Sequence, residues 1–443
     1  MNDTPLWFEV LPPHWRVSRL AAHLERNDSG AWGADATIPG EGVPVLRSTD
    51  ITIDGAWSKP LEPEYRVLDP NAYRTTRLAV NDLLVTKSSG SERHIGKTAL
   101  VTQEVADLAP GFSNFMQRLR CTDTLWSRYA WYCMNSPITR LQLNYWASTT
   151  TGLANLNGSL LGRLRIAMPA LPEQCAITDF LDHETGKIEL LVAKKQHLLE
   201  SLQELERALI DHAICAGWSP TDPTLPNGWR VLRLQHLTRP DKPIMYGIVL
   251  PGPHVPGGVP LIKGGDVERG LSVATLNRTT VAIDAEHARS RVNSGDIVFA
   301  IRGSYGAVAQ VPRELKGANL TQDAARVSPG SGVDNDFLFY ALRSSAVFAQ
   351  VEAGAVGATI KGINIRDLKR ARIPVPPLDE QKALAGLVSR ELTLIRARTS
   401  KIRQGIDLMR ELKSVVVTAA VTGQIDVTNS VRTESAQIDR IDD

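Results

Sequence analysis

The longest hydrophobic pattern of the chain lies between residues 173 and 214, a stretch without proline and with Gly186 as its single glycine. Apolar side chains return there every seven positions in two rows that lie four residues apart, which is the spacing of a coiled-coil seam. The rows are Ile177, Glu184, Leu191, Leu198, Leu205, His212 and Leu181, Ile188, Lys195, Leu202, Leu209. The pattern predicts one long amphipathic helix.

A second stretch, 380–421, repeats this pattern in a weaker form. Its better row is Val388, Ile395, Ile402, Met409, Val416, and a parallel row holds Leu387, Leu394, Leu408 and Val415. At 1.5 Å per residue each helix would be about 63 Å long. A single helix of that length would leave its apolar stripe in water, so we predict that the two helices pair. An antiparallel pair is the expected arrangement, because it relates two repeats by a two-fold axis.

The segments before each helix are different in character. Short apolar runs at 83–86, 98–102 and 166–169 are typical of strands, and Gly, Ser, Thr, Asn and Pro separate them. Short helices are expected at 129–136 and 337–344. We therefore predict two β-rich globular blocks, named here block 1 (1–170) and block 2 (218–377).

The chain contains an internal repeat. LPPHWRVSRL at 11–20 returns as LPNGWRVLRL at 225–234, and ALPEQ at 170–174 returns as PLDEQ at 377–381. The predicted fold is α+β and pseudo-two-fold, with block 1, a helix at 171–217, block 2, a helix at 378–425, and a disordered polar tail at 426–443. Such a molecule suits a target that is itself nearly two-fold, and duplex DNA is one.

The net charge of +2 gives no sign of a nucleic-acid partner, but the distribution of charge is informative. Block 2 carries 19 basic and 13 acidic residues, whereas block 1 carries 17 and 16. The segment 171–217 is acidic, with 4 basic and 9 acidic residues. An acidic helix favours a protein partner over phosphate, although a solvated helix face explains it equally well.

The four cysteines, Cys121, Cys133, Cys175 and Cys215, form no C-x-x-C pair and no zinc-ligand spacing. Scattered cysteines in a chain of this length indicate a reducing, cytoplasmic location. No run of 18 apolar residues is present, so we expect no membrane span.

The motif IPVPPLDEQ at 373–381, its looser copy MPALPEQ at 168–174, and the two L-P-x-x-W openings resemble the specificity subunit of type I restriction–modification systems. The resemblance covers 1–425. It implies that each block is a target-recognition domain for double-stranded DNA, and that an antiparallel coiled coil sets their spacing and docks two methyltransferase subunits. It further implies a non-catalytic chain without a cofactor, whose partners, including restriction/translocase subunits, use S-adenosylmethionine, ATP and Mg.

Because the blocks differ over most of their sequence, the expected DNA target is asymmetric and bipartite. Loops with Arg, Lys, Asn, Ser and Thr carry the candidate contacts, because these side chains read base edges and phosphates. The candidate DNA-binding residues are Arg47, Lys87, Ser88, Ser89, Ser91, Arg93, His94, Thr150, Asn155 and Asn157 in block 1, and Lys263, Arg302, Ser304, Tyr305, Thr359, Lys361 and Asn364 in block 2. Ordinary polar loops are the alternative interpretation of these stretches.

Other functions remain open or are disfavoured. A specificity subunit of a related methyltransferase system without a translocase fits the same motifs, and a coiled-coil scaffold that binds only proteins is a further alternative. The segment 90–98 imitates a phosphate-binding loop, but five residues separate its glycines where the motif needs four. The chain has no Asn-Pro-Pro-aromatic or Asp-Pro-Pro-aromatic tetrapeptide, the motif with which adenine methyltransferases hold a flipped base.

Overall fold

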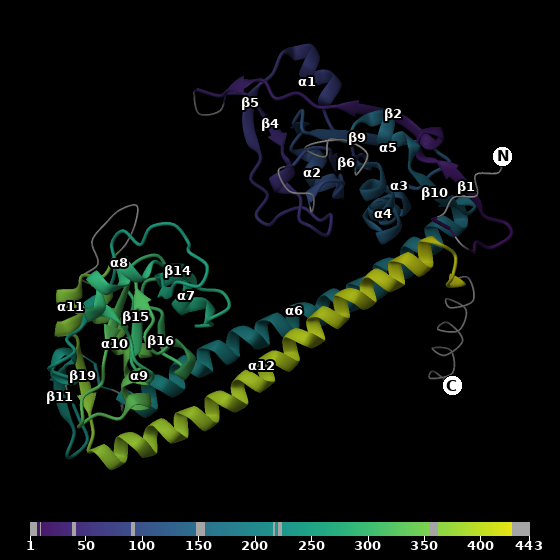
Figure 1. Ribbon diagram of the computed structural model, residues 1–443. Helices are drawn as coiled ribbons and strands as arrows, with labels where there is room; N and C mark the ends of the chain where they lie inside the picture. The colour runs from purple at the N-terminus through teal and green to yellow at the C-terminus, as the bar shows by residue number, and fades with distance from the viewer. Residues whose placement is uncertain are drawn as a thin grey trace, which may run out of the picture. The chain divides into compact units, whose positions relative to one another are not determined.

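A computed structural model describes residues 7–8, 10–37, 41–89, 94–147, 156–215, 218–219, 224–353 and 362–427 (Figure 1). The chain forms two compact units. Unit 1 contains residues 1–194 and 404–443, and unit 2 contains residues 195–403. Each unit therefore holds one block together with a part of each long helix.

Block 1 is built from short strands and short helices. In chain order they are β1 (Arg16–Arg19), η1 (Leu20–His23), β2 (Leu24–Ser29), β3 (Ala34–Asp35), β4 (Val43–Leu46), η2 (Ser48–Asp50), β5 (Glu64–Val67), α1 (Pro70–Thr76), β6 (Leu83–Thr86), β7 (Thr98–Leu100), α2 (Gln103–Asp107), β8 (Gly111–Phe112), β9 (Met116–Cys121), α3 (Ser127–Asn135), α4 (Pro137–Ala147), α5 (Gly158–Arg163) and β10 (Arg165–Met168).

Block 2 has the same kind of composition. Its elements are β11 (Arg230–Arg233), η4 (Leu234–His236), β12 (Met245–Tyr246), β13 (Val259–Ile262), α7 (Gly264–Arg269), β14 (Asn277–Thr279), α8 (Val281–Glu286), η5 (Ala288–Ser290), β15 (Ile297–Ala300), β16 (Val308–Gln310), η6 (Arg313–Leu315), β17 (Asn319–Leu320), β18 (Ala324–Val327), α9 (Asn335–Arg343), α10 (Ser345–Glu352), α11 (Ile365–Arg370) and β19 (Arg372–Val375).

The two blocks share one topology. A four-stranded antiparallel sheet has the order β2-β9-β6-β7 in block 1 and β12-β18-β15-β16 in block 2. A second sheet has the order β3-β5-β4-β8 in block 1 and β14-β13-β17 in block 2, and each contains one parallel pair, β4 with β8 and β13 with β17. The first and last strands of each block also pair, β1 with β10 and β11 with β19. The predicted repeat and the α+β fold class are confirmed.

The central strands explain why the sequence shows apolar runs without alternation. All four residues of β6 and all four of β15 are buried, since each strand is covered on both faces. On one face the sheet packs with α3 or α9 and with the long helices. On the other face lies a smaller core shared with the second sheet.

Two long helices, α6 (Leu171–Cys215) and α12 (Leu378–Val421), run through both units. In unit 1 the start of α6 and the end of α12 share a core that contains Ile177, Leu181, Val417 and Val421. An ion pair in the same unit joins Glu189 to Lys413 at 2.6 Å. Because the beginning of α6 packs against the end of α12, the residue numbers of the two helices run in opposite directions, and the helices are antiparallel there.

Unit 2 shows the same pairing of the two helices. The end of α6 and the start of α12 share a core that includes Ile210, Val388 and Leu392. Glu206 lies 3.9 Å from Arg396. The predicted antiparallel pairing is therefore confirmed within each unit.

One part of the predicted seam is wrong. Of the first α6 row, Ile177 is buried, but Leu191, Leu198 and Leu205 are each close to half exposed. The half-buried positions lie one residue later, at Val192, Leu199, Glu206 and Ala213, and the earlier members of that row are the buried Thr178 and Thr185. A row that includes threonine and glutamate carries a weaker apolar signal than a row of leucines, so the pattern selected the wrong face.

The second row of α12 is wrong in the same way. Val388 and Ile395 are buried, whereas Leu387, Leu394, Leu408 and Val415 are 41–66% exposed. We name these four residues and Leu191, Leu198 and Leu205 the outer rows. They follow a seven-residue spacing on their helices but contribute little to the seam.

The repeated motif at each helix start is a structural joint. Gln174 accepts a hydrogen bond from the backbone N–H of Trp126 at 2.8 Å and donates to the carbonyl groups of Thr124 and Pro169 at 3.1 and 3.0 Å. Gln381 repeats all three bonds: it accepts from the N–H of Asp334 at 2.9 Å and donates to the carbonyl groups of Gly332 and Pro376 at 3.5 and 2.9 Å. Both glutamines are buried, so these bonds fix the start of each helix against its own block.

No helix in the described ranges combines the length and the apolar character needed to cross a membrane. Of the predicted tail, residues 428–443 lie outside the described residues. Val427, at its beginning, is buried with the core of unit 1.

Candidate nucleic-acid interface

The first pair of candidate cations occupies equivalent places in the two blocks. Arg47 follows β4 and Lys263 follows β13, and each residue begins a helical turn. The backbone N–H of Arg47 donates to Asp50 at 2.6 Å, and that of Lys263 donates to Asp266 at 3.0 Å. Both aspartates are buried, so a fixed carboxylate sets the backbone at each cation.

The side chains at these two places behave differently. The Arg47 guanidinium donates to Glu64 at 2.7 Å and to the carbonyl of Glu62 at 3.1 Å. Lys263 has no ion pair or side-chain hydrogen bond among the residues that the structure describes. Lys263 is thus available to an external anion, whereas Arg47 is already engaged by a carboxylate.

The second pair of loops follows the central strands β6 and β15. The N–H groups of Lys87 and Ser88 donate to the carbonyl of Phe115, and those of Ile301 and Arg302 donate to that of Asp323. Lys87 therefore corresponds to Ile301, and Ser88 to Arg302. The Lys87 ammonium donates to the Ser29 hydroxyl, and partial burial lowers its pKa. The Arg302 guanidinium is exposed and donates to Gln322 at 3.3 Å.

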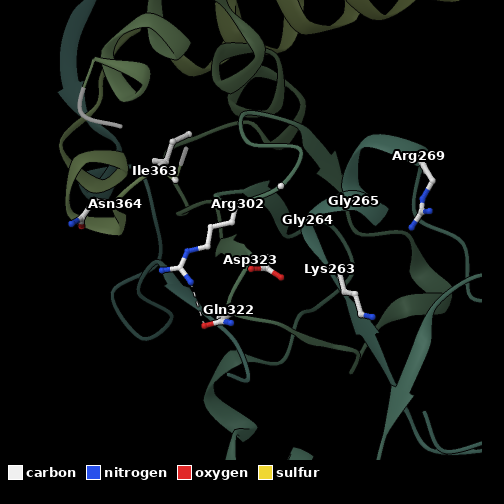
Figure 2. Close-up of a pocket in the computed structure, with 11 residues that line it drawn as sticks. Lys263, Gly264, Gly265, Arg269, Arg302, Gln322, Asp323, Ile363 and Asn364 are labelled. Carbon is white, nitrogen blue, oxygen red and sulfur yellow. Dashed lines mark hydrogen bonds between the residues drawn. The ribbon is translucent and has the colours of Figure 1, made fainter. Parts of the chain in front are cut away.

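These loops surround an open cavity of about 810 Å³ in block 2, which we name the Lys263 cavity. Figure 2 shows Lys263, Arg302, Gln322 and Asn364 around it, each contributed by a different loop or helix end. Arg269 also lines it, and its guanidinium is paired with Asp266 at 2.7 Å. The structure thus brings three of the sequence-predicted residues, Lys263, Arg302 and Asn364, to one site.

Two asparagines of the candidate set have a structural role. The Asn157 side chain accepts from the N–H of Leu160 at 2.8 Å and caps α5, and the Asn364 side chain accepts from the N–H of Arg366 at 2.8 Å and caps α11. Both side chains are exposed, and their amide NH₂ groups have no partner in the described part of the chain. A cap residue can still donate outward with this group.

The other candidates in block 2 are tied to nearby glutamates. The Ser304 hydroxyl donates to Glu268, and the Tyr305 hydroxyl donates to Glu352 at 3.2 Å. The Tyr305 ring also stacks on Phe348. Neither residue lines the Lys263 cavity.

The remaining candidates are placed only in part. In block 1, Ser88 and Ser89 are half-buried and His94 is exposed. The predicted contacts Ser91, Arg93, Thr150, Asn155, Thr359 and Lys361 lie outside the described residues.

Sequence reasoning missed Arg269, Gln322 and Asp323, which also line the Lys263 cavity. Arg269 lies on a short helix, where a charged residue looks like an ordinary solvated position. Gln322 could have been found from the sequence, because it is a polar amide residue two positions after the strand β17. Asn114 lies at the equivalent position after β8 in block 1.

The described residues contain no group of three or more His, Cys, Asp or Glu that could hold a metal ion. Burial raises the pKa of the Cys215 thiol to about 11 and that of the Cys133 thiol to about 12. These two thiols are therefore protonated at neutral pH.

Residues 255–404 match the family described as "Type I restriction modification DNA specificity domain". The chain is 26% identical over 371 residues to the putative type I restriction enzyme MjaX specificity subunit of Methanocaldococcus jannaschii, covering 79% of this chain and 80% of that protein. It is 21% identical over 294 residues to the type I restriction enzyme EcoBI specificity subunit of Escherichia coli, covering 63% of this chain and 62% of that protein, a little under two thirds of its length.

A solved chain of a type I restriction–modification system has a TM-score of 0.71 to this structure at 16% identity, covering 94% of this chain and all of that one. At this identity the likeness concerns the fold. The resemblance drawn from the repeated motifs is confirmed.

Proposed function

We propose that this chain, which belongs to the specificity-subunit family of type I restriction–modification systems, recognises an asymmetric, bipartite DNA sequence with one half-site per block. The observation that carries the proposal is the convergence of Lys263, Arg302 and Asn364 on one open cavity of block 2. These side chains come from three separate segments. The buried Asp266 accepts from the backbone N–H of Lys263, and the carbonyl of Asp323 accepts from the backbone N–H of Arg302.

The chemistry of the cavity suits a base-pair edge. Arg and Lys pair with guanine in the major groove, and Asn and Gln pair with adenine. Lys263, Arg302, Gln322 and Asn364 supply both kinds of donor at the Lys263 cavity. Asp323 adds an acceptor that suits the amino group of cytosine.

The two blocks should read different half-sites. They share the backbone framework, but Lys263 is replaced by Arg47, which is engaged by Glu64, and Arg302 is replaced by Ser88. A conserved scaffold with exchanged loop side chains changes the bases that are read and leaves the way the block approaches DNA unchanged.

We also propose that the chain is non-catalytic and binds no cofactor of its own. The absence of the adenine-methyltransferase tetrapeptide from the sequence supports this assignment. Methyl transfer from S-adenosylmethionine would then belong to partner subunits, and ATP and Mg would serve a restriction/translocase subunit. The four cysteines are free thiols, which agrees with a reducing cytoplasmic location.

The outer rows are the proposed docking surface for two methyltransferase subunits. Leu191, Leu198 and Leu205 are 46–50% exposed on α6, and the α12 row is exposed to a similar extent. Exposed leucines at seven-residue spacing are the pattern into which an amphipathic partner helix packs. The same rows favour the second candidate function, a scaffold that binds only proteins.

Sequencing of methylated sites tests the proposal in cells that carry the chain with its methyltransferase partners. We expect a bipartite methylated sequence, and we expect Lys263→Ala and Arg302→Ala to relax base preference in one half-site only. Arg313→Ala, at an exposed cation outside the Lys263 cavity, is the matched control. Absence of any sequence-specific methylation that depends on the chain would favour the scaffold. Methylation without restriction would favour a system that lacks a translocase.

A further inference from the structure

A second cavity of block 2, of about 440 Å³, is lined by residues of α11 and does not share a lining residue with the Lys263 cavity. We name it the Lys369 cavity. Lys369 and Arg289 line it together with Tyr246, His287 and Glu286. Helix α11 connects the two cavities, because its cap Asn364 lines the first and its residues Ile365 and Lys369 line the second.

Three cations of this region are unengaged. Arg289, Arg366 and Lys369 form no ion pair and no side-chain hydrogen bond within the described ranges. Arg289 and Arg366 are exposed, and Lys369 is half-buried one helical turn after Arg366. Glu286 and Asp367 offset part of this charge but are paired with none of the three cations.

The equivalent places of block 1 carry no charge. The N–H of Leu156 donates to Lys87 O and the N–H of Ile363 donates to Ile301 O, both at 2.8 Å, so the caps Asn157 and Asn364 correspond. Counting from the caps, Ser159 corresponds to Arg366 and Gly162 to Lys369.

The third cation is aligned by a buried arginine. The Arg118 guanidinium donates to the carbonyl of Thr75 at 2.7 Å, and the Arg326 guanidinium donates to that of Arg289 at 2.6 Å. Arg118 and Arg326 occupy the same position of β9 and β18. Thr75 therefore stands where block 2 has Arg289, and all three cations belong to block 2 alone.

From this asymmetry we infer that block 2 carries a phosphate-binding track, Arg289–Arg366–Lys369, which grips the DNA backbone flanking its half-site and has no counterpart in block 1. The inference rests on the proposed DNA recognition and adds to it that the two flanks of the target are held unequally. The track contributes three cations to the excess of basic over acidic residues in block 2. Because phosphates are alike at every sequence, the track contributes affinity and not base preference.

The test uses the full chain and a 40-base-pair duplex that contains the methylated site, with a scrambled duplex of equal length beside it. The variant Arg289→Thr, Arg366→Ser, Lys369→Gln removes the three charges. Each phosphate contact contributes roughly 0.9 to the slope of log affinity against log salt, so we expect a slope smaller by about 2.7. Between 50 and 200 mM salt the wild type should therefore lose roughly 40-fold more affinity than the variant.

Two controls make the result specific to the track. Arg313→Gln with Lys316→Gln removes two exposed cations of block 2 that line neither cavity, and it should leave the slope unchanged. Thr75→Arg with Ser159→Arg places two of the cations on exposed positions of block 1 and should raise the slope by about two.

Trimmed duplexes supply the second readout. Shortening the flank next to the half-site of block 2 should weaken the wild type and not the variant, and shortening the opposite flank should affect neither. An unchanged slope in the variant, or equal sensitivity to both flanks, would overturn the track. If the wild type does not prefer its site over the scrambled duplex, the proposed sequence recognition is wrong. The track is still tested in that case, because the salt slopes of wild type and variant can be compared on the scrambled duplex.

Discussion

Trp15 donates its indole hydrogen to the carboxylate of Glu173 at 3.0 Å, and Trp229 donates to Glu380 at 3.1 Å in the same way. Both tryptophans are buried, and both glutamates lie in the first turn of a long helix. The two most visible repeated motifs of the sequence are therefore the two halves of one joint. This joint connects the opening strand of each block to the helix that follows the block.

Removal of the carboxylate from this joint should destabilise unit 2. Glu380→Ala leaves the buried indole N–H of Trp229 without its acceptor, and we expect a loss of about 1–2 kcal/mol in the free energy of unfolding. Pulse proteolysis in urea, with fragments of unit 2 identified by mass spectrometry, measures this change in the free energy of unfolding. Asp379→Ala is the control, since it removes an exposed acid from the same helix turn and leaves the bond intact. Equal losses in the two variants would show that charge near the helix end, and not the bond, matters.

A buried arginine is paired in one block and unpaired in the other. Arg118 donates to Asp28 at 2.8 Å, whereas Met245 stands opposite Arg326, whose Nε is buried without a partner. We expect Asp28→Met to destabilise unit 1 by about 2 kcal/mol or more, because it leaves the buried guanidinium of Arg118 without its carboxylate partner. We expect Met245→Asp to stabilise unit 2 by about 1 kcal/mol, because it gives Arg326 such a partner.

Thermal unfolding of the two single variants and the wild type gives the sign of each effect. A loss of stability in Met245→Asp would mean that the packing of the Met245 side chain outweighs a carboxylate partner for Arg326.

The stability of block 2 should decrease in acid. Burial by itself would raise the pKa of Asp284, but hydrogen bonds from Arg291 and Asn319 outweigh burial and lower it. A depressed folded-state pKa gives stability that is complete above the unfolded-state pKa of about 3.9 and is lost as the pH falls through the folded-state value.

Hydrogen exchange of peptides from block 2, followed from pH 6 downwards, should show this loss of protection in the wild type. Asp284→Asn should flatten the profile, and Glu286→Gln, an exposed acid of the same helix, should leave it unchanged. A steep profile that persists in Asp284→Asn would assign the acid sensitivity to another group.

The outer rows should matter for assembly and little for folding. Leu191→Gln with Leu198→Gln should change the free energy of unfolding by no more than about 0.5 kcal/mol per site, because both side chains are near half exposed. The affinity for methyltransferase subunits should fall at least tenfold, which co-purification and calorimetry can measure. Leu202→Ala, at a buried position of the same helix, should instead cost about 2–5 kcal/mol of stability. Unchanged assembly in the double variant would remove the outer rows as the docking surface.

The long helices should act as a ruler. Both pass from one unit to the other, so we propose inserting seven residues after Leu198 and seven after Arg403. The insertion adds about 10 Å of helix, or roughly three base pairs of B-DNA. Sequencing of methylated sites should show a longer gap between unchanged half-sites, and an insertion after the exposed Ser331 should not change the gap. Altered half-sites around an unchanged gap would contradict this role.

The sequence allowed the repeat, the two helices and the central strands to be predicted, because these features depend on local apolar spacing. The exposed side of each helix was not predictable in this way. Leu191 and Val192 are both apolar, and only the partner helix decides which one is covered. Arg269 and Asp323 were missed for a related reason, since a cavity formed by separate loops leaves no spacing in the sequence.

Each block begins and ends on a paired strand: Arg16 lies opposite Met168, and Arg230 lies opposite Val375. The chain thus enters and leaves each block through two adjacent, hydrogen-bonded strands. Recombination that replaces everything between those strands would preserve the helices and their partners. Under the proposed function, such an exchange would change the DNA target in a single genetic event and would leave the surfaces of the long helices unaltered.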